Sequence, residues 1–420
     1  MSFSTLQKPF QKSANGHNRR DFMRIGSVAG LGMAEIMQMQ QLAAAEGKDR
    51  SDINCIFIFI VGGMPQQDMW DLKPEAPAEI RGDFHKISTN VPGIQISDVI
   101  PGCATVVDKM AILRSMTHDD SDHGRGFHVM MSGKKAGAGD FNGHQNNNQH
   151  PCIGSMVSEL GKPGVLPPYI SLPNFLNSGG PSFLGPANGP FVIDADPAAP
   201  DFSVRDIALP TSVATKRGQL RQLALQQINA IEENVAREGK QVQSLDTFYK
   251  KAYNLMASKE AREAFDIDRE PEKLREAYGM TSIGQCCLLA RRMVESGCRF
   301  VAVENGHWDT HRKNTYSLRD LLCPAFDQAI PALLNDLEDR GMLDDTLVVI
   351  TTEFGRTPRI NELSGRDHWP NAFSIVMAGG GVQGGQVIGK TDKQAAEVAD
   401  RPITPEDMVA TILYGLGIDH

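Results

Sequence analysis

The chain has 420 residues, and its content of 41% hydrophobic and 22% charged residues is that of an ordinary globular protein. Its formal net charge of -9 argues against a nucleic-acid-binding surface, which would need an excess of lysine and arginine. The length is enough for one large α/β domain or for two smaller domains.

The amino-terminal residues 1–45 have the features of an export signal. Arg19 and Arg20 are followed by Phe22, by a weakly apolar stretch and by small residues at an A-x-A cleavage spacing. This order resembles a twin-arginine signal, whose usual core is R-R-x-F-L-K; a basic tail outside the fold is the alternative. The apolar stretch is too short and too polar to span a membrane. We therefore expect the twin-arginine translocase to export the chain to the periplasm or another extracytoplasmic space, without a stable membrane span.

Seven cysteines are scattered along the chain without a C-x-x-C pair. This spacing argues against zinc-finger and thioredoxin-type sites. Because the number is odd, at least one thiol stays unpaired within the chain. We expect most of the seven to be buried as small apolar residues. Disulfide formation after export is the alternative, and the sequence does not assign any pairing.

Five apolar, β-branched runs are typical of buried strands, and helical patterns separate several of them. The predicted strands comprise residues 54–63, 108–116, 299–305, 346–355 and 373–381. The predicted helices comprise residues 281–297, 317–341 and 404–417, the last beginning with Thr404 as a cap and Pro405 in its first turn. This pattern predicts an α/β fold with a central, mostly parallel sheet flanked by helices on both faces.

Residues 46–420 are expected to form a single domain that contains a helical insertion. The insertion comprises about residues 211–268, which are rich in Gln, Glu, Lys and Ala and have apolar residues at helical spacing. Residues 139–151 are polar and residues 172–190 are rich in Pro and Gly, so both segments are expected to be surface loops.

Carboxylate and imidazole side chains follow four of the predicted strands. The motifs concerned are "GGMPQQDMWDLKP", "RSMTHDDSDHGRGFH", "NGHWDTH" and "TTEFGRTPR", with "SGRDHWP" a short loop later. Functional groups collect at the carboxyl ends of strands in open α/β sheets, so these side chains are expected to share one edge. That many carboxylates would repel one another without a bound cation. We therefore predict a divalent metal ion, with Zn, Mn, Mg and Ca as the alternatives.

Five residues are the predicted metal ligands. Asp309 and His311 are two residues apart, so in an extended segment both side chains point the same way. His368 and Glu353 are the next candidates. Asp68 is the fifth, although it could instead cap a helix.

The candidates for contact with a substrate are imidazole and guanidinium groups. His123 and His128 are five residues apart, so one of them could bind substrate while the other does not. Arg356 could hold an anionic substrate with its planar fork, or could bridge to an acid. His307 could support a ligand from behind.

Several motifs in the same order resemble those of the DUF1501 family of bacterial proteins. They are "VGGMPQQDMWDLKP", "LRSMTHDDSDHGRGFHVMMSG", "NGHWDTH", "TEFGRTPRIN" and "GRDHWPNAFSIVMAGGGVQGGQVIG". The resemblance extends from about Asn54 to the carboxyl end. The fold that it implies is similar to that of the alkaline phosphatase and sulfatase superfamily, whose members hold one or two divalent metals at the carboxyl edge of a central sheet.

The superfamily pattern implies metal ligands at four of the positions already singled out. The acidic ligand after the first strand corresponds to Asp68, the late Asp-and-His motif to Asp309 and His311, and the final histidine to His368.

Two departures from the superfamily pattern concern the second metal and the nucleophile. The usual Asp-His pair falls on Glu353 and Phe354, and a phenylalanine cannot bind metal. The C-x-P-x-R motif of sulfatases has no counterpart, which leaves His123, Ser121 and Ser132 as the options in the corresponding stretch. The resemblance therefore implies either one or two metal ions, and a covalent step that is altered or absent.

Two functions are consistent with these observations. The first is an exported metal-dependent hydrolase of phosphate or sulfate esters, acting on an anionic small molecule or a glycan ester, with Arg356 and His123 stabilising negative charge. The second is a non-catalytic member of the same fold that binds an anionic glycan or a protein partner. A nicotinamide-dependent oxidoreductase is disfavoured because "GGGVQGG" has neither a following helix nor a suitably spaced acidic residue.

Overall fold

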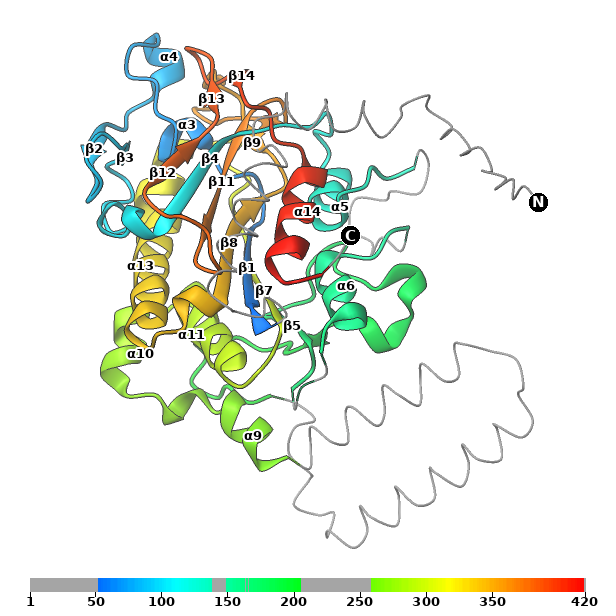
Figure 1. Ribbon diagram of the computed structural model, residues 1–420. Coiled ribbons are helices and arrows are strands. Elements are labelled where there is room, and N and C mark those ends of the chain that lie inside the picture. Colours follow the sequence, from blue (N-terminus) through cyan, green and yellow to red (C-terminus); the bar gives the residue numbers. More distant parts are fainter. Residues whose placement is uncertain (1–51, 138–148, 163, 165, 205–257, 419–420) are drawn as a thin grey trace, which may run out of the picture. The chain divides into compact units, whose positions relative to one another are not determined.

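The computed structural model describes residues 52–137, 149–162, 164, 166–204 and 258–418 (Figure 1). The expected twin-arginine signal lies outside these residues, as does most of the expected helical insertion. Within the described ranges, no helix combines the length and the apolar character that crossing a bilayer requires.

The apolar run Asn54–Ile60 forms β1, the strand around which the sheet is built. It pairs in parallel with β7 (Phe300–Asn305) on one side and with β8 (Thr346–Thr352) on the other. Residues 55–60 are fully buried. Side chains on both faces of β1 are therefore covered, which explains its nearly continuous apolar sequence.

In the part of the chain that the structure describes, the main sheet has the strand order β12-β4-β11-β8-β1-β7-β5-β6. All of its pairs are parallel except the two that β11 makes, so the predicted mostly parallel sheet is confirmed. The remaining strands are β4 (Met110–Met116), β5 (Tyr169–Leu172), β6 (Phe191–Val192), β11 (Phe373–Ala378) and β12 (Gln386–Ile388).

The reversed direction of β11 has a consequence for the site. Phe373, the first residue of β11, is paired with Met116, the last residue of β4. The amino end of β11 therefore lies at the edge where the carboxyl ends of β1, β4, β7 and β8 meet. Residues that precede Phe373 in the chain thus reach the same edge as residues that follow the parallel strands.

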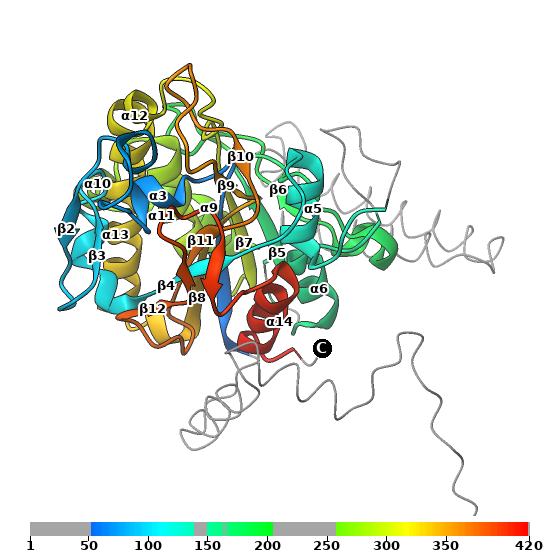
Figure 2. The same ribbon diagram turned by 90° about the horizontal axis from the view of Figure 1, so that it is seen from above.

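Alternate residues of β1 face two separate layers of helices. Ile56, Ile58 and Ile60 belong to one apolar core, and Phe57 and Phe59 to the other. Figures 1 and 2 show the two helical layers on opposite faces of the sheet. The first layer contains α10 (Glu272–Tyr278), α11 (Ser282–Glu295) and α13 (Cys323–Asp339), and the second contains α5 (His123–Ser132), α6 (Ile153–Leu160) and α14 (Pro405–Gly415).

The three predicted helices are present, with one difference. The segment predicted as one helix over residues 317–341 begins as a π-helix, Ser317–Leu322, before α13 continues it. The last helix begins as predicted, because Thr404 and Asp407 form a reciprocal capping box.

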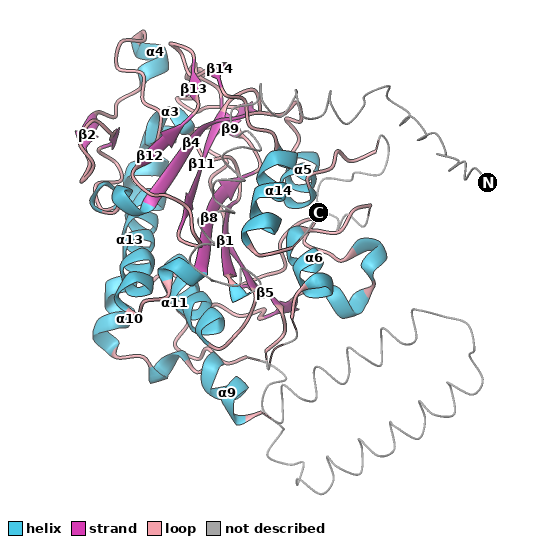
Figure 3. Cartoon of the chain, viewed as in Figure 1, coloured by secondary structure: helices cyan, strands magenta, loops and turns pink. Residues whose placement is uncertain are grey.

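Short elements connect the main ones (Figure 3). The short helices are α3 (Gln66–Met69), α4 (Ala78–Arg81), α9 (Lys259–Phe265) and α12 (Asn314–Tyr316). The short strands are β2 (Lys86–Ser88), β3 (Gln95–Ser97), β9 (Gly355–Arg356), β10 (His368–Trp369), β13 (Lys390–Thr391) and β14 (Val398–Asp400).

All seven cysteines lie in the described part of the chain, where they are buried and free. Burial raises the pKa of the Cys287 and Cys298 thiols to about 12. These thiols are therefore small core residues in their neutral form, as the sequence predicts.

A buried ionic network ties α11 to α13 and to the segment before α10. The Arg291 side chain is completely buried and lies 2.8 Å from Glu270 and 2.9 Å from Asp336. Asp336 also accepts a hydrogen bond of 2.8 Å from the Tyr278 hydroxyl. Removal of one partner would leave a buried charge unpaired, which is costly. We therefore expect this network to stabilise the fold, although it lies in a helical layer and not at the edge of the sheet where the candidate site residues lie.

We predict that Arg291→Met lowers the free energy of unfolding by about 3 kcal/mol, because it leaves buried carboxylates with fewer cationic partners. Denaturant titration of the wild type and the variant measures this difference. A change below about 0.5 kcal/mol, the range of ordinary surface substitutions, would contradict a stabilising role.

Candidate metal centre

A glycine at the end of β1 allows the loop after β7 to pack closely against it. Gly62 has a φ of 119°, and a Cβ atom there would lie 2.3 Å from the backbone nitrogen of Asp309. The backbone nitrogen of Trp308 donates a hydrogen bond of 3.0 Å to the Val61 carbonyl. The lack of a side chain at Gly62 therefore brings Asp309 to the carboxyl end of β1.

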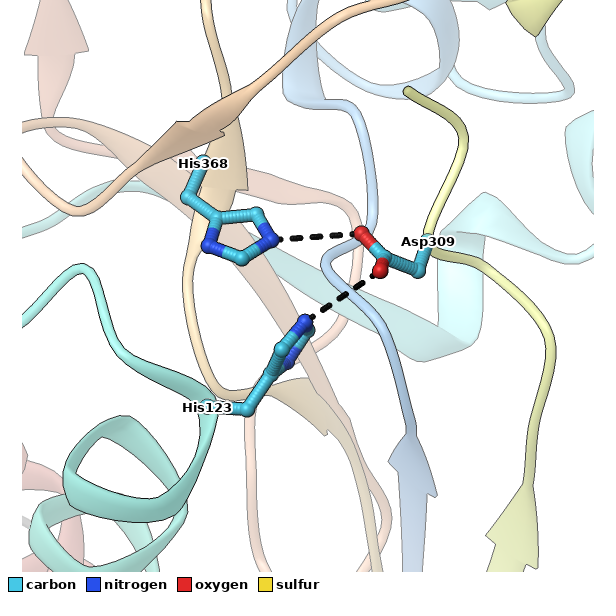
Figure 4. A group of neighbouring side chains, drawn as sticks. All are labelled: His123, Asp309 and His368. Atoms are coloured by element: carbon cyan, nitrogen blue, oxygen red, sulfur yellow. Dashed lines mark hydrogen bonds and ion pairs between the residues drawn. The ribbon is translucent and has the colours of Figure 1, made fainter. Parts of the chain in front are cut away.

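Asp309 is the meeting point of two imidazoles from distant segments (Figure 4). His123 Nε2 lies 3.4 Å from Asp309 Oδ2, and His368 Nε2 lies 3.2 Å from Asp309 Oδ1. One ligand atom from each of the three residues lies within 4.8 Å of the others. His123 follows β4 and His368 precedes β11, which are neighbouring strands, whereas Asp309 follows β7 on the other side of β1.

His311 brings a third imidazole to the same place. Its Nε2 atom lies 3.0 Å from Asp309 Oδ1 and 3.0 Å from His368 Nε2. The structure thus brings together three of the predicted ligands, Asp309, His311 and His368, and adds His123, which sequence reasoning had placed beside the substrate.

In each of the three imidazoles the far nitrogen, Nδ1, contacts a hydrogen-bond acceptor. A carboxylate or carbonyl oxygen can only accept, so in a neutral ring Nδ1 carries the proton and Nε2 has a free lone pair. We assign the tautomers from these hydrogen-bond partners. In neutral rings, three Nε2 atoms with a free lone pair would then surround the Asp309 carboxylate. The contacts are His123 Nδ1 to Glu353 Oε1 at 2.7 Å, His311 Nδ1 to Asp367 Oδ1 at 2.6 Å, and His368 Nδ1 to the Ser121 carbonyl at 2.7 Å.

The electrostatics of the metal-free centre favour positive charge at its middle. Burial alone would lower the pKa of His123, but its hydrogen bonds with Asp309 and Glu353 outweigh burial and raise that pKa to about 9. Burial alone would raise the pKa of Asp309, but hydrogen bonds from His123 and His368 and the Arg356 charge hold it well below its usual range. A proton on His123 therefore balances the Asp309 carboxylate, in a position that a cation could take.

Glu353, a predicted ligand, lies behind His123 and is completely buried. Its Oε1 atom accepts hydrogen bonds of 2.7 Å from the Gly62 backbone and from His123, and its Oε2 atom accepts one of 3.1 Å from the Thr352 hydroxyl. The Glu353 carbonyl accepts a further bond of 2.7 Å from His118 Nε2. These hydrogen bonds orient the His123 ring. The role of Glu353 as a metal ligand stays a prediction.

Arg356, a predicted substrate contact, is completely buried beneath Asp309. Its guanidinium donates to the Asp309 carboxylate, to the Gly63 carbonyl at 3.1 Å and to the Arg366 carbonyl at 3.0 Å. Burial lowers the pKa of Arg356, and the Asp309 charge opposes this shift. The sequence suggests that Arg356 either binds an anionic substrate or bridges to an acidic residue. The contact with Asp309 is a bridge of the second kind.

Asp68, the fifth predicted ligand, makes its side-chain hydrogen bonds within the described part of the chain with Arg366 and Asn314, and none with the three imidazoles. Among the other candidates, His128 Nε2 lies 2.9 Å from His150 Nδ1 and Ser132 donates to the His128 carbonyl. Ser121 is exposed and contacts the centre through its carbonyl.

His307 is exposed and adopts a positive φ of 73°. Asp367, the partner of His311, was missed as a functional residue, although its place beside His368 in "GRDHWP" was a usable signal.

The chain matches, over residues 52–420, the family described as "Protein of unknown function (DUF1501)". The chain belongs to the DUF1501 family. The family that the motifs predict is thereby confirmed. No curated protein matches this DUF1501 chain in sequence.

Solved structures with a similar arrangement include a sulfatase, a phosphonate monoester hydrolase and a lipoteichoic acid synthase. A sulfatase from Pseudoalteromonas sp. is 15% identical, with a TM-score of 0.42, over 93% of this chain and 71% of that one. A phosphonate monoester hydrolase from Silicibacter pomeroyi is 12% identical, with a TM-score of 0.39, over 87% and 74%. The lipoteichoic acid synthase from Listeria monocytogenes is 10% identical, with a TM-score of 0.37, over 88% and 72%. At these scores and identities the likeness carries no conclusion about the activity of the DUF1501 protein.

We predict that the metal-free DUF1501 protein loses stability as the pH rises from about 6.5, the unfolded pKa of histidine, to about 9, the folded pKa of His123. A group whose pKa is raised by folding stabilises the folded state below its unfolded pKa, and this contribution disappears as the pH passes the folded value. Denaturant titrations with a chelator present measure the effect. The variant His123→Asn should show a shallower decline, and equal slopes would show that His123 is not charged there.

Proposed function

We propose that the protein is an exported, metal-dependent hydrolase of phosphate or sulfate esters. The observation that carries this proposal is the set of three imidazoles whose Nδ1 atoms are occupied and whose Nε2 atoms face one carboxylate. The Nε2 lone pairs of neutral imidazoles would repel the carboxylate, so either protons or a cation must lie between these groups. A divalent cation that replaces these protons could bind the carboxylate and the three imidazoles.

The donor set suits Zn²⁺ best among the divalent ions. Three imidazole nitrogens and one carboxylate oxygen are ligands that Zn²⁺ takes in four-coordinate sites, and Mn²⁺ accepts them as well. Mg²⁺ and Ca²⁺ prefer oxygen ligands almost exclusively, so they fit this set poorly. The orienting carboxylates Glu353 and Asp367 behind two of the histidines are the outer partners that such sites usually have.

The two sides of the centre differ in solvent access, which determines where a substrate could bind. The side chains of Asp309 and His311 are 44% and 40% exposed, whereas Glu353 and Arg356 are completely buried. A substrate would therefore approach over Asp309 and His311. The buried groups would hold the ligands in place and keep water from the far side.

The reaction would be displacement at phosphorus or sulfur. A bound divalent ion polarises the ester oxygen and acidifies a water molecule. The water oxygen would form a bond to phosphorus or sulfur while the bond to the ester oxygen breaks. One water proton would leave with the alcohol, and the other would stay on the phosphate or sulfate or pass to solvent. Ser121 is exposed and its carbonyl holds His368, so its hydroxyl is the alternative nucleophile. The substrate class and the extracytoplasmic location rest on the sequence motifs and the amino-terminal signal.

We predict that purified mature protein binds a divalent ion and that His311→Ala loses both the ion and the turnover of aryl phosphate or aryl sulfate esters. Metal analysis and a chromogenic ester screen measure the two properties. The control is His85→Ala, because His85 is an exposed residue whose contact is with Asp98. Metal binding without turnover of either ester would favour a non-catalytic binding protein, and no metal binding would sink the proposal.

We predict that Asp367→Asn weakens metal binding by about 10- to 100-fold, the usual effect of altering a group behind a histidine ligand. Asparagine preserves the size of the side chain but removes the charge that holds the His311 Nδ1 proton. Competition with a chelator of known affinity gives the dissociation constant. An unchanged constant would show that Asp367 does not orient His311.

A further inference from the structure

Asp68 and Arg366 form a buried ion pair beside the metal centre. Arg366 Nε lies 2.8 Å from Asp68 Oδ2, and Arg366 Nη2 lies 2.9 Å from Asp68 Oδ1. Both side chains are almost completely buried. The geometry is that of a bidentate guanidinium–carboxylate pair, which fixes the orientation of both groups.

The remaining hydrogen-bonding capacity of the pair is also occupied. Arg366 donates to the carbonyls of Ile80 at 2.9 Å, Thr357 at 3.1 Å and Pro358. Asp68 Oδ2 accepts a second bond, of 2.8 Å, from Asn314 Nδ2. Asp68 is thus paired with a guanidinium group, and both of its oxygens accept hydrogen bonds from protein donors.

The pair joins the two segments that carry Asp309, His311 and His368, which are residues 309–314 and residues 361–368, here called the ligand loops. Arg366 donates its backbone N–H to the Thr310 carbonyl at 3.0 Å. Asn314 donates its backbone N–H to the Ser364 carbonyl at 2.8 Å and accepts from the Thr310 hydroxyl at 2.6 Å.

The ligand loops also approach very closely near His311. Asn361 Nδ2 donates to the His311 carbonyl at 3.1 Å, and a Cβ atom on Gly365 would lie 2.0 Å from that same carbonyl group. Displacement of either loop would therefore move His368 relative to Asp309 and His311.

We infer that Asp68 and Arg366 are positioning residues of the metal centre, and that the centre holds one cation per chain. Arg366 supplies the positive charge that Asp68 requires, so Asp68 is not available to ligate a second ion. The pair acts through the ligand loops, by fixing the position of His368 relative to Asp309 and His311. This inference rests on the metal binding proposed above.

Cobalt(II) is the probe that tests the inference, because its visible absorption reports both the amount bound and the coordination geometry. Mature metal-free protein is titrated with cobalt(II), and the bound ion is counted and its spectrum recorded. The wild type should bind one ion per chain. Arg366→Met and Asp68→Asn should each weaken binding by about 10- to 100-fold and shift the absorption bands, since the ligands are no longer held at the same spacing.

The matched control is Arg291→Met, which breaks a buried arginine pair in the helical layer instead of at the centre. It should lower stability while its folded form keeps the wild-type cobalt affinity and spectrum. Thermal unfolding of each metal-free variant shows whether it is folded. If Arg366→Met does not fold, the cobalt affinity and spectrum of the nearly isosteric variant Asp68→Asn test the inference.

The outcomes separate this inference from the proposed function. Two cobalt ions per wild-type chain, reduced to one by Asp68→Asn, would make Asp68 a ligand and overturn the inference while leaving a metal-dependent hydrolase standing. Unchanged affinity and spectrum in a folded Asp68→Asn variant would overturn the positioning role alone. No cobalt binding by the wild type would overturn both proposals.

Discussion

The position of the Asp309 carboxylate is the constraint on which the candidate centre depends. Arg356 holds it from the buried side, and three imidazoles approach it from the exposed side. A carboxylate among so many donors stays ionised over the whole physiological range, as its depressed pKa indicates. The site is therefore anionic at its middle and is surrounded by groups that can exchange protons for a cation.

Each group around Asp309 is itself held on its far side. Glu353 holds His123, Asp367 holds His311 and the Ser121 carbonyl holds His368. The contacts of His123 and His368 join residues 230 and 247 apart in the chain, and that of His311 joins residues 56 apart. The carboxyl edge of the sheet brings these segments together. Such preorganisation reduces the rearrangement that metal binding would require.

Much of the fold follows from the sequence, because apolar runs such as Asn54–Ile60 and capping residues such as Thr404 act locally. The direction of β11 does not, since a buried run reads the same in a parallel or an antiparallel strand. It is nevertheless this reversal that brings His368 to the edge.

For the site, the sequence predicts which residue types are present. It does not predict which of them face Asp309 and which hold those residues from the far side. Glu353 and His123 were both recognised, yet only the structure shows the carboxylate behind the imidazole. Asp68 was expected at the metal, but its partner Arg366 lies 298 residues away in the chain, and no local pattern reports such a contact.

The seven buried cysteines allow local unfolding of the protein to be measured by thiol labelling. A thiol that is sealed in the core and kept protonated reacts slowly with alkylating reagents, because the thiolate is the nucleophile. Modification then requires that the surrounding layer separate first. The rate at which such reagents label the protein would therefore record how often each helical layer detaches from the sheet, with Cys286 and Cys287 sampling one face and Cys152 the other.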